Sequence, residues 1–249
     1  MATPRRRRIR LGLLVFWSLV IGWMFWNMQP KRVAATVFEN TPDVEVTRTG
    51  DALIFSPRTD TAGAGLIFYP GAMVHPEAYT PLARAVAEAG YRALIVRLPW
   101  RLAPTNAHRQ GLAARTLEHI RDDDRAWVLG GHSRGGALAT QLAPHLADSL
   151  AGLLLIGTSH PREHDLSGLS LDVTKVYATE DGLASVPEVE QFAAHLPETT
   201  RWVRIEGGNH SQFGWYGWQL GAGTATIPHA DQHAQTVAAT LAQLARVAR

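Results

Sequence analysis

The sequence contains no cysteine among its 249 residues. The chain can therefore form no disulfide, thiol nucleophile or thiolate metal site. It also lacks a dinucleotide-binding fingerprint, a P-loop and an HExxH zinc motif. Histidines lie four residues apart at His160/His164 and His229/His233, but neither pair forms an HExxH motif, and a proline lies between the first two. We expect neither a metal nor a cofactor.

Acidic residues are missing from the first 32 positions, which hold seven of the 24 basic residues. The rest of the chain keeps 17 basic and 22 acidic residues, a formal charge of −5 from residue 33 onward. Phosphate binding needs a basic face, so this mildly acidic body argues against nucleic acid as a partner.

Residues 11–28 carry no charge. As a helix, 18 residues span about 27 Å, close to the hydrocarbon thickness of a bilayer. Four arginines at 5–8 and Arg10 precede this run, and the positive-inside rule places such a tail in the cytoplasm. The sequence thus predicts a basic tail (1–10), a single-pass membrane anchor (11–28), a linker (29–43) and an extracytoplasmic catalytic domain (44–249).

Two alternatives to the anchor remain open. A cleaved signal peptide has the same charge pattern and would release a secreted protein, although the residues after the apolar run suit cleavage poorly. A buried helix of a soluble protein has the same composition. In the first alternative, as with the anchor, the body lies outside the cytoplasm.

Short apolar runs alternate with helical patterns along the body. Residues 44–50 and 52–57 alternate like an antiparallel pair around Gly50 and Asp51, and continuous apolar runs typical of buried parallel strands follow. Helices are expected at 76–90, 134–147, 187–196 and 231–248, with Pro144 ending or bending the second. This pattern predicts an α/β fold, a mostly parallel, doubly wound sheet with helices on both faces. The expected strand runs after the first pair are 65–70, 93–99, 126–131, 152–157, 175–180 and 201–207.

Ser133 lies in the sequence Gly131-His132-Ser133-Arg134-Gly135, between an expected strand and an expected helix. A serine hydroxyl is a weak nucleophile unless it is exposed, oriented and placed next to a base. A tight strand–turn–helix connection provides the exposure, and glycines on both sides leave room for it. We therefore predict that Ser133 is a catalytic nucleophile.

With this motif, and with similar segments at 68–74, 178–185 and 206–217, the sequence resembles the α/β-hydrolase superfamily, most closely the small, uncapped members related to dienelactone hydrolases. The resemblance covers most of residues 52–249. It implies the order nucleophile, acid, histidine, which Ser133, Asp181 and His210 follow. Only about 15 residues separate the strands at 152–157 and 175–180, too few for a large cap domain.

The triad assigns a role to each of these residues. Ser133 attacks an acyl carbonyl, His210 accepts and returns its proton, and Asp181 orients His210. The oxyanion is expected to receive the backbone amides of Arg134 and of Ala72, in the turn at 69–73. The alternatives are an Asp-Gly turn former for Asp181 and a solvated loop histidine for His210.

Other residues are expected to set the substrate. Arg134 either binds an anionic substrate group or, as we favour, forms an ordinary salt bridge or is solvated. Aromatic residues in the long loop after His210 either wall an acyl pocket or cover the sheet edge. The candidate substrate-lining residues are Met73, His75, His132, Phe213, Trp215 and Tyr216.

Together these features predict a serine hydrolase that cleaves ester or thioester bonds of a small acyl substrate. Two alternatives remain: a non-catalytic, membrane-anchored binding or scaffold protein of the same fold, and an acyltransferase that uses the same triad. The oligomeric state is not predicted by the sequence.

Overall fold

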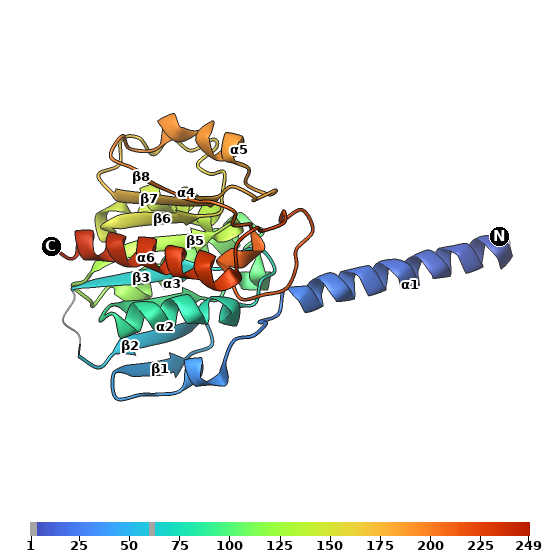
Figure 1. The fold of residues 1–249 in the computed structure, drawn as a ribbon, viewed down its shortest axis with the longest axis horizontal. Coiled ribbons are helices and arrows are strands. Elements are labelled where there is room, and N and C mark those ends of the chain that lie inside the picture. Colours follow the sequence, from blue (N-terminus) through green and yellow to red (C-terminus); the bar gives the residue numbers. More distant parts are fainter. Residues whose placement is uncertain (1–3, 60–62) are drawn as a thin grey trace.

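The computed structural model describes residues 4–59 and 63–249, with side chains from residue 9 onward. Its centre is an eight-stranded sheet in the order β1-β2-β4-β3-β5-β6-β7-β8 (Figure 1). β1 and β2 form the predicted antiparallel pair, β2 also runs antiparallel to β4, and the other neighbours are parallel. The strands are β1 (Val44–Arg48), β2 (Ala52–Pro57), β3 (Ala64–Tyr69), β4 (Arg92–Val96), β5 (Ala126–His132), β6 (Gly152–Ile156), β7 (Asp172–Ala178) and β8 (Arg201–Ile205).

Helices cover both faces of the sheet, as the continuous apolar strands predict. α2 (Thr80–Glu88) and α6 (His229–Val247) pack on one face together with Leu66 and Phe68 of β3. α3 (Asn106–Ile120) and α4 (Arg134–Leu146) pack on the other face with Ile67 and Tyr69 of the same strand. Alternate side chains of β3 thus point into two hydrophobic cores, one on each face of the sheet.

The helices differ from the sequence expectation in detail. α3 was not predicted, because its buried residues include the polar Thr116 beside Leu112 and Ile120. α4 runs two residues beyond Pro144, so the proline does not end it. The helix expected at 187–196 is reduced to α5 (Val186–Glu190) and a 3-10 turn at Ala193–His195. No cap domain interrupts the described residues, and the sheet with its covering helices is an α/β-hydrolase fold.

α1 (Pro4–Asn27) projects from the body at the edge where the parallel strands end (Figure 1). Its segment Ile9–Asn27 is long and apolar enough to cross a membrane, with a mean hydropathy of 1.7, and none of that window is buried in the protein. The predicted helix therefore exists, but it is not the core helix of a soluble domain.

The residues after α1 lie against the domain. Met28 is buried in the core, and the amide of His75 donates to its carbonyl at 2.9 Å. The amide of Gly217 donates to the carbonyl of Asn27 at 2.6 Å. Further on, the guanidinium of Arg84 donates to the carbonyl of Glu39 at 2.7 Å. The end of the predicted anchor and the predicted linker are thus both held against the body.

Candidate active site

Ser133 occupies the turn between β5 and α4 in a left-handed backbone conformation, with φ 52° and ψ −116°. Its amide donates to the carbonyl of Ile156 at 2.9 Å, which fixes the turn to β6. A Cβ at Gly135 would lie 1.9 Å from the carbonyl oxygen of Tyr69, and one at Gly131 would lie 2.3 Å from the backbone of Gly135. The glycines are there because the helix starts in contact with two strands.

Asp181 and His210 form a hydrogen-bonded pair in the interior. Asp181 Oδ2 lies 2.8 Å from His210 Nδ1, and the two side chains are 0% and 1% exposed. The other carboxylate oxygen accepts from the amides of Leu183 and Ala184, both at 2.8 Å. His210 Nε2 is buried and has no hydrogen-bond partner among the described residues. The carboxylate thus holds the ring so that its second nitrogen is available.

Ser133 opens into a cavity of about 240 Å³. Leu183 and Ala184, which bind the Asp181 carboxylate, form one wall of this cavity. Its other walls include the polar side chains of His160 and Arg162. Ser133 and the loop that carries Asp181 therefore border the same space, at the carboxyl ends of β5 and β7, which β6 separates in the sheet.

The turn at 70–73 presents one unpaired amide. The Gly71 amide donates to the Tyr79 hydroxyl at 3.0 Å, and the Met73 amide donates to the carbonyl of Arg101 at 2.8 Å. The amides of Ala72 and Arg134, the two predicted oxyanion donors, have no acceptor in the part of the chain that the structure describes. Both remain available to an oxyanion.

His132 is buried, at 1% exposure, rather than lining the cavity at Ser133. Its Nδ1 lies 2.8 Å from the Tyr79 hydroxyl, and because that hydroxyl accepts from the Gly71 amide, its proton is directed to His132. Burial, reinforced by the proximity of His210, holds the pKa of His132 well below its usual range. A neutral His132 with Nδ1 as acceptor fits this arrangement. Tyr79 was missed because 53 residues separate it from His132.

Arg134 forms no salt bridge with the residues that the structure describes, and its side chain borders the cavity at Ser133. Its half-buried guanidinium donates to the carbonyls of Leu102 and Ala103, at 3.2 and 3.3 Å. Burial lowers its pKa. Since Arg101 also accepts from the Met73 amide, the loop at 99–103 is tied to both the nucleophile helix and the oxyanion turn.

The other predicted lining residues divide into two groups. Phe213 is buried against the ring of His132, with centroids 5.5 Å apart, and the Tyr216 hydroxyl, also buried, donates to the carbonyl of His210 at 3.4 Å. These aromatic residues pack against His132 and His210. Met73 is 41% exposed and His75 half-buried, both beside the end of α1. Trp215 stacks on His229 of α6.

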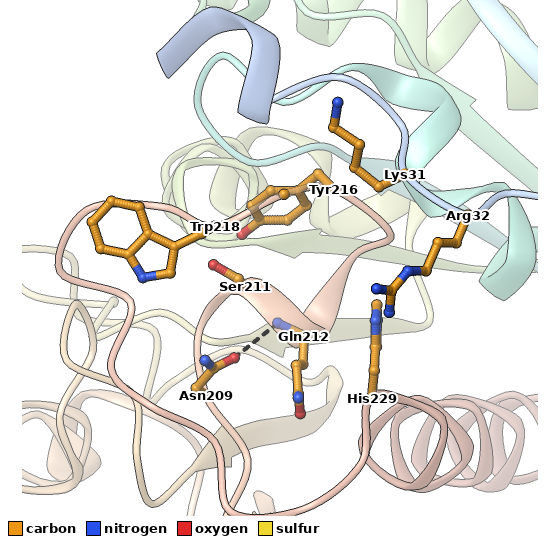
Figure 2. Close-up of a pocket in the computed structure, with 9 residues that line it drawn as sticks. Lys31, Arg32, Asn209, Ser211, Gln212, Tyr216, Trp218 and His229 are labelled. Carbon is orange, nitrogen blue, oxygen red and sulfur yellow. Dashed lines mark hydrogen bonds between the residues drawn. The ribbon is translucent and has the colours of Figure 1, made fainter. Parts of the chain in front are cut away.

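A second cavity, of about 480 Å³, is bordered by Asn209, Ser211 and Gln212, which flank His210 in the sequence (Figure 2). Lys31 and Arg32, which follow α1, border one side, and Asn209, Gln212 and His229 border the other (Figure 2). Asn209 Oδ1 accepts from the Gln212 amide at 3.1 Å. Within residues 9–59 and 63–249, no three histidine, aspartate or glutamate side chains are arranged to hold a metal ion.

Residues 65–234 match a model of the alpha/beta hydrolase family. No curated protein matches the sequence significantly. Among solved structures, Est1E from Butyrivibrio proteoclasticus is 12% identical, with a TM-score of 0.59 over 82% of this chain and 99% of that one. A serine hydrolase without a lid from Xanthomonas campestris is 14% identical, with a TM-score of 0.56 over 82% and 96%. A dienelactone-hydrolase-like promiscuous phosphotriesterase from metagenomic libraries is 15% identical, with a TM-score of 0.58 over 79% and 92%.

Proposed function

Because the chain belongs to the alpha/beta hydrolase family, we propose that it is a serine hydrolase of the small, uncapped, dienelactone-hydrolase-like branch, which cleaves ester or thioester bonds. The observation that carries this proposal is the buried hydrogen bond between Asp181 and His210, which leaves His210 Nε2 without a partner while the His210 ring lies 4.5 Å, between centroids, from His132, the residue before Ser133. A buried carboxylate–imidazole pair with a free nitrogen is the arrangement that activates a serine hydroxyl.

The reaction has two halves. Ser133 Oγ attacks the acyl carbon while His210 Nε2 takes the hydroxyl proton, and the bond to the leaving group breaks as His210 gives the proton to that group. In the second half, water attacks the carbonyl carbon of the acyl-enzyme while His210 takes its proton, and the bond to Ser133 Oγ breaks. This step releases the carboxylic acid and regenerates Ser133. Asp181 stabilises the imidazolium in both halves because its second oxygen is held by two amides.

The oxyanion of each tetrahedral intermediate is stabilised by the amides of Ala72 and Arg134. Two observations support this assignment: both amides lack a protein acceptor in the described chain, and the neighbouring amides of Gly71 and Met73 are already engaged. The loss of one oxyanion donor costs about 3 kcal/mol of transition-state stabilisation in serine hydrolases.

We place this activity at a membrane, with residues 11–28 as an uncleaved anchor and the domain outside the cytoplasm. Burial of Met28 and the backbone hydrogen bonds of Asn27 and Met28 support retention of the segment, because cleavage after it would remove a core residue. The mass of the protein isolated from membranes tests this point. We expect the full chain, whereas a chain that begins beyond residue 28 would contradict the anchor.

A fluorophosphonate probe tests the catalytic proposal on the full-length protein in detergent. We expect labelling of the wild type and none of Ser133→Ala or His210→Ala. Ser159→Ala is the matched control, because Ser159 lines the same cavity and is not assigned to the triad. Labelling that persists in Ser133→Ala would overturn the assignment of Ser133 as the nucleophile. Absence of labelling from the folded wild type would favour a binding or scaffold protein.

A further inference from the structure

An apolar groove of about 410 Å³ lies where α1 meets the predicted oxyanion turn. One wall consists of Ile21, Met24 and Phe25 of α1 with Met28, which follows the helix, and another consists of Ala72 and Met73. Leu220 and Gln219, from the loop after His210, form the third. Gln219 is the one polar residue among them, so the groove suits a hydrocarbon occupant.

The groove is open rather than filled. Ile21 and Leu220 are 64% and 66% exposed. Trp218, 48% exposed beside this loop, packs on Trp23 of α1 at 5.6 Å between ring centroids. Water contact with so much apolar surface is unfavourable, so such a patch marks a site for a ligand, partner or lipid.

The position of α1 indicates that the ligand of the groove comes from the lipid bilayer. Ile21 and the α1 groove residues up to Phe25 belong to the candidate membrane span Ile9–Asn27. If this span is inserted, part of the groove wall lies at the depth of the hydrocarbon chains. Lys31, whose ammonium lies 3.9 Å from the ring centroid of Trp26, then marks the polar interface.

The groove also borders the predicted oxyanion turn. Ala72, one of its walls, is the residue whose amide we assign to the oxyanion. The amide of His75 and the carbonyl of Met28 are joined at 2.9 Å, so the turn and the end of α1 hold a fixed relation. A chain lying in the groove would bring its carbonyl end to Ala72.

We infer that the groove binds the hydrocarbon chain of an amphiphilic ester drawn from the bilayer, so that the substrate class is a membrane-resident, long-chain acyl ester. This inference rests on the proposed serine hydrolase function. Ser133 Oγ forms a bond to the acyl carbon, and the bond from that carbon to the leaving oxygen breaks. The serine proton passes through His210 to the leaving oxygen, and water later releases the fatty acid.

The test uses the full-length protein in phosphatidylcholine vesicles, with p-nitrophenyl acetate and p-nitrophenyl dodecanoate as probes. We expect a higher kcat/KM for the dodecanoyl ester. Leu220→Asn and Met73→Asn should lower the dodecanoyl-to-acetyl ratio about tenfold each, the effect of losing one apolar contact of this size. Leu117→Asn is the matched control, because Leu117 lies on α3 outside the groove and is 38% exposed. It should leave both rates unchanged.

The outcomes separate the two proposals. In one outcome, the wild type hydrolyses the acetyl ester, Ser133→Ala does not, and neither groove variant changes the dodecanoyl-to-acetyl ratio. This outcome would overturn the proposal that the groove binds the acyl chain and would support the proposed hydrolase function. Failure of the folded wild type to hydrolyse either ester would overturn both. Both groove residues are exposed, at 66% and 41%, so their substitution leaves the core intact.

Discussion

The imidazole rings of His132 and His210 pack against each other with their centroids 4.5 Å apart. Two cationic imidazoles at this distance would repel each other, and burial together with this proximity keeps the pKa of His132 low. His132 is therefore expected to stay neutral in the proposed reaction, in which His210 takes the proton of Ser133. Its other contact, with the Tyr79 hydroxyl that holds the Gly71 amide, makes it a positioning residue for the oxyanion turn.

Replacement of His132 by Phe should lower kcat roughly tenfold with little change in KM. The reason is that the buried Tyr79 hydroxyl loses its acceptor, a cost of about 1–3 kcal/mol, and its hold on the turn loosens. Steady-state kinetics with a short ester check this. Tyr79→Phe should cause a similar loss, and the double variant should lose little more, because both residues act through one contact. Fully additive losses would contradict the positioning role.

Asp181→Asn should lower kcat by about 10³- to 10⁴-fold, because an amide in place of the carboxylate favours the wrong tautomer of His210. The matched control is Glu180→Gln, since Glu180 precedes Asp181 in the same loop and is exposed. Kinetics of both variants with the same ester decide between the two acids. An equal loss in Glu180→Gln would contradict the assignment of Asp181.

Gly135→Ala should destabilise the protein by more than about 3 kcal/mol, because its Cβ would meet the Tyr69 carbonyl oxygen at 1.9 Å. Gly111→Ala should do the reverse and stabilise by about 0.5–1 kcal/mol, since Gly111 is a helical residue of α3 with open space at its Cβ position. Urea denaturation of the two variants measures both free energies of unfolding. A tolerated Gly135→Ala would show that the elbow is looser than described.

The free energy of unfolding should fall as the pH drops from about 6.5 to 4. Burial, with a smaller effect of Arg162, lowers the pKa of His160 to about 4, and burial, with His229, lowers that of His233 to about 4. In this window the unfolded chain binds protons that the folded chain does not, so acid favours unfolding. Below pH 4 these two groups add no further loss.

Urea denaturation at several pH values measures this slope. His233→Leu should flatten it, whereas His145→Leu should leave it unchanged because His145 is exposed at the end of α4. An unchanged slope in His233→Leu would exclude His233 as a source of the acid sensitivity.

The sheet could be predicted because each of its strands has a local signature. The runs at 65–70 and 152–157 are continuous and apolar, and the structure places strands there that are buried on both faces. The elbow was predictable for the same reason, since glycines flank Ser133 within five residues. Local pattern is enough where one short segment determines the conformation.

Contacts between distant segments could not be predicted in this way. Nothing near His132 signals Tyr79, and nothing near Arg134 signals the carbonyls of residues 102 and 103. The same holds for Met28, which follows an exposed helix and yet is buried in the core. These residues acquire their surroundings from the tertiary fold alone.

The loop at 99–103 binds the two halves of the oxyanion site at once. Trp100, Arg101 and Ala103 all have positive φ, so the loop carries backbone strain that its contacts must offset. Since the Arg134 side chain and the Met73 amide bind to it, displacement of the loop would disturb both oxyanion donors together. If Ala72 and Arg134 donate to an oxyanion as proposed, this loop couples the two donors thermodynamically, and a change some distance from the reacting atoms would weaken both at once.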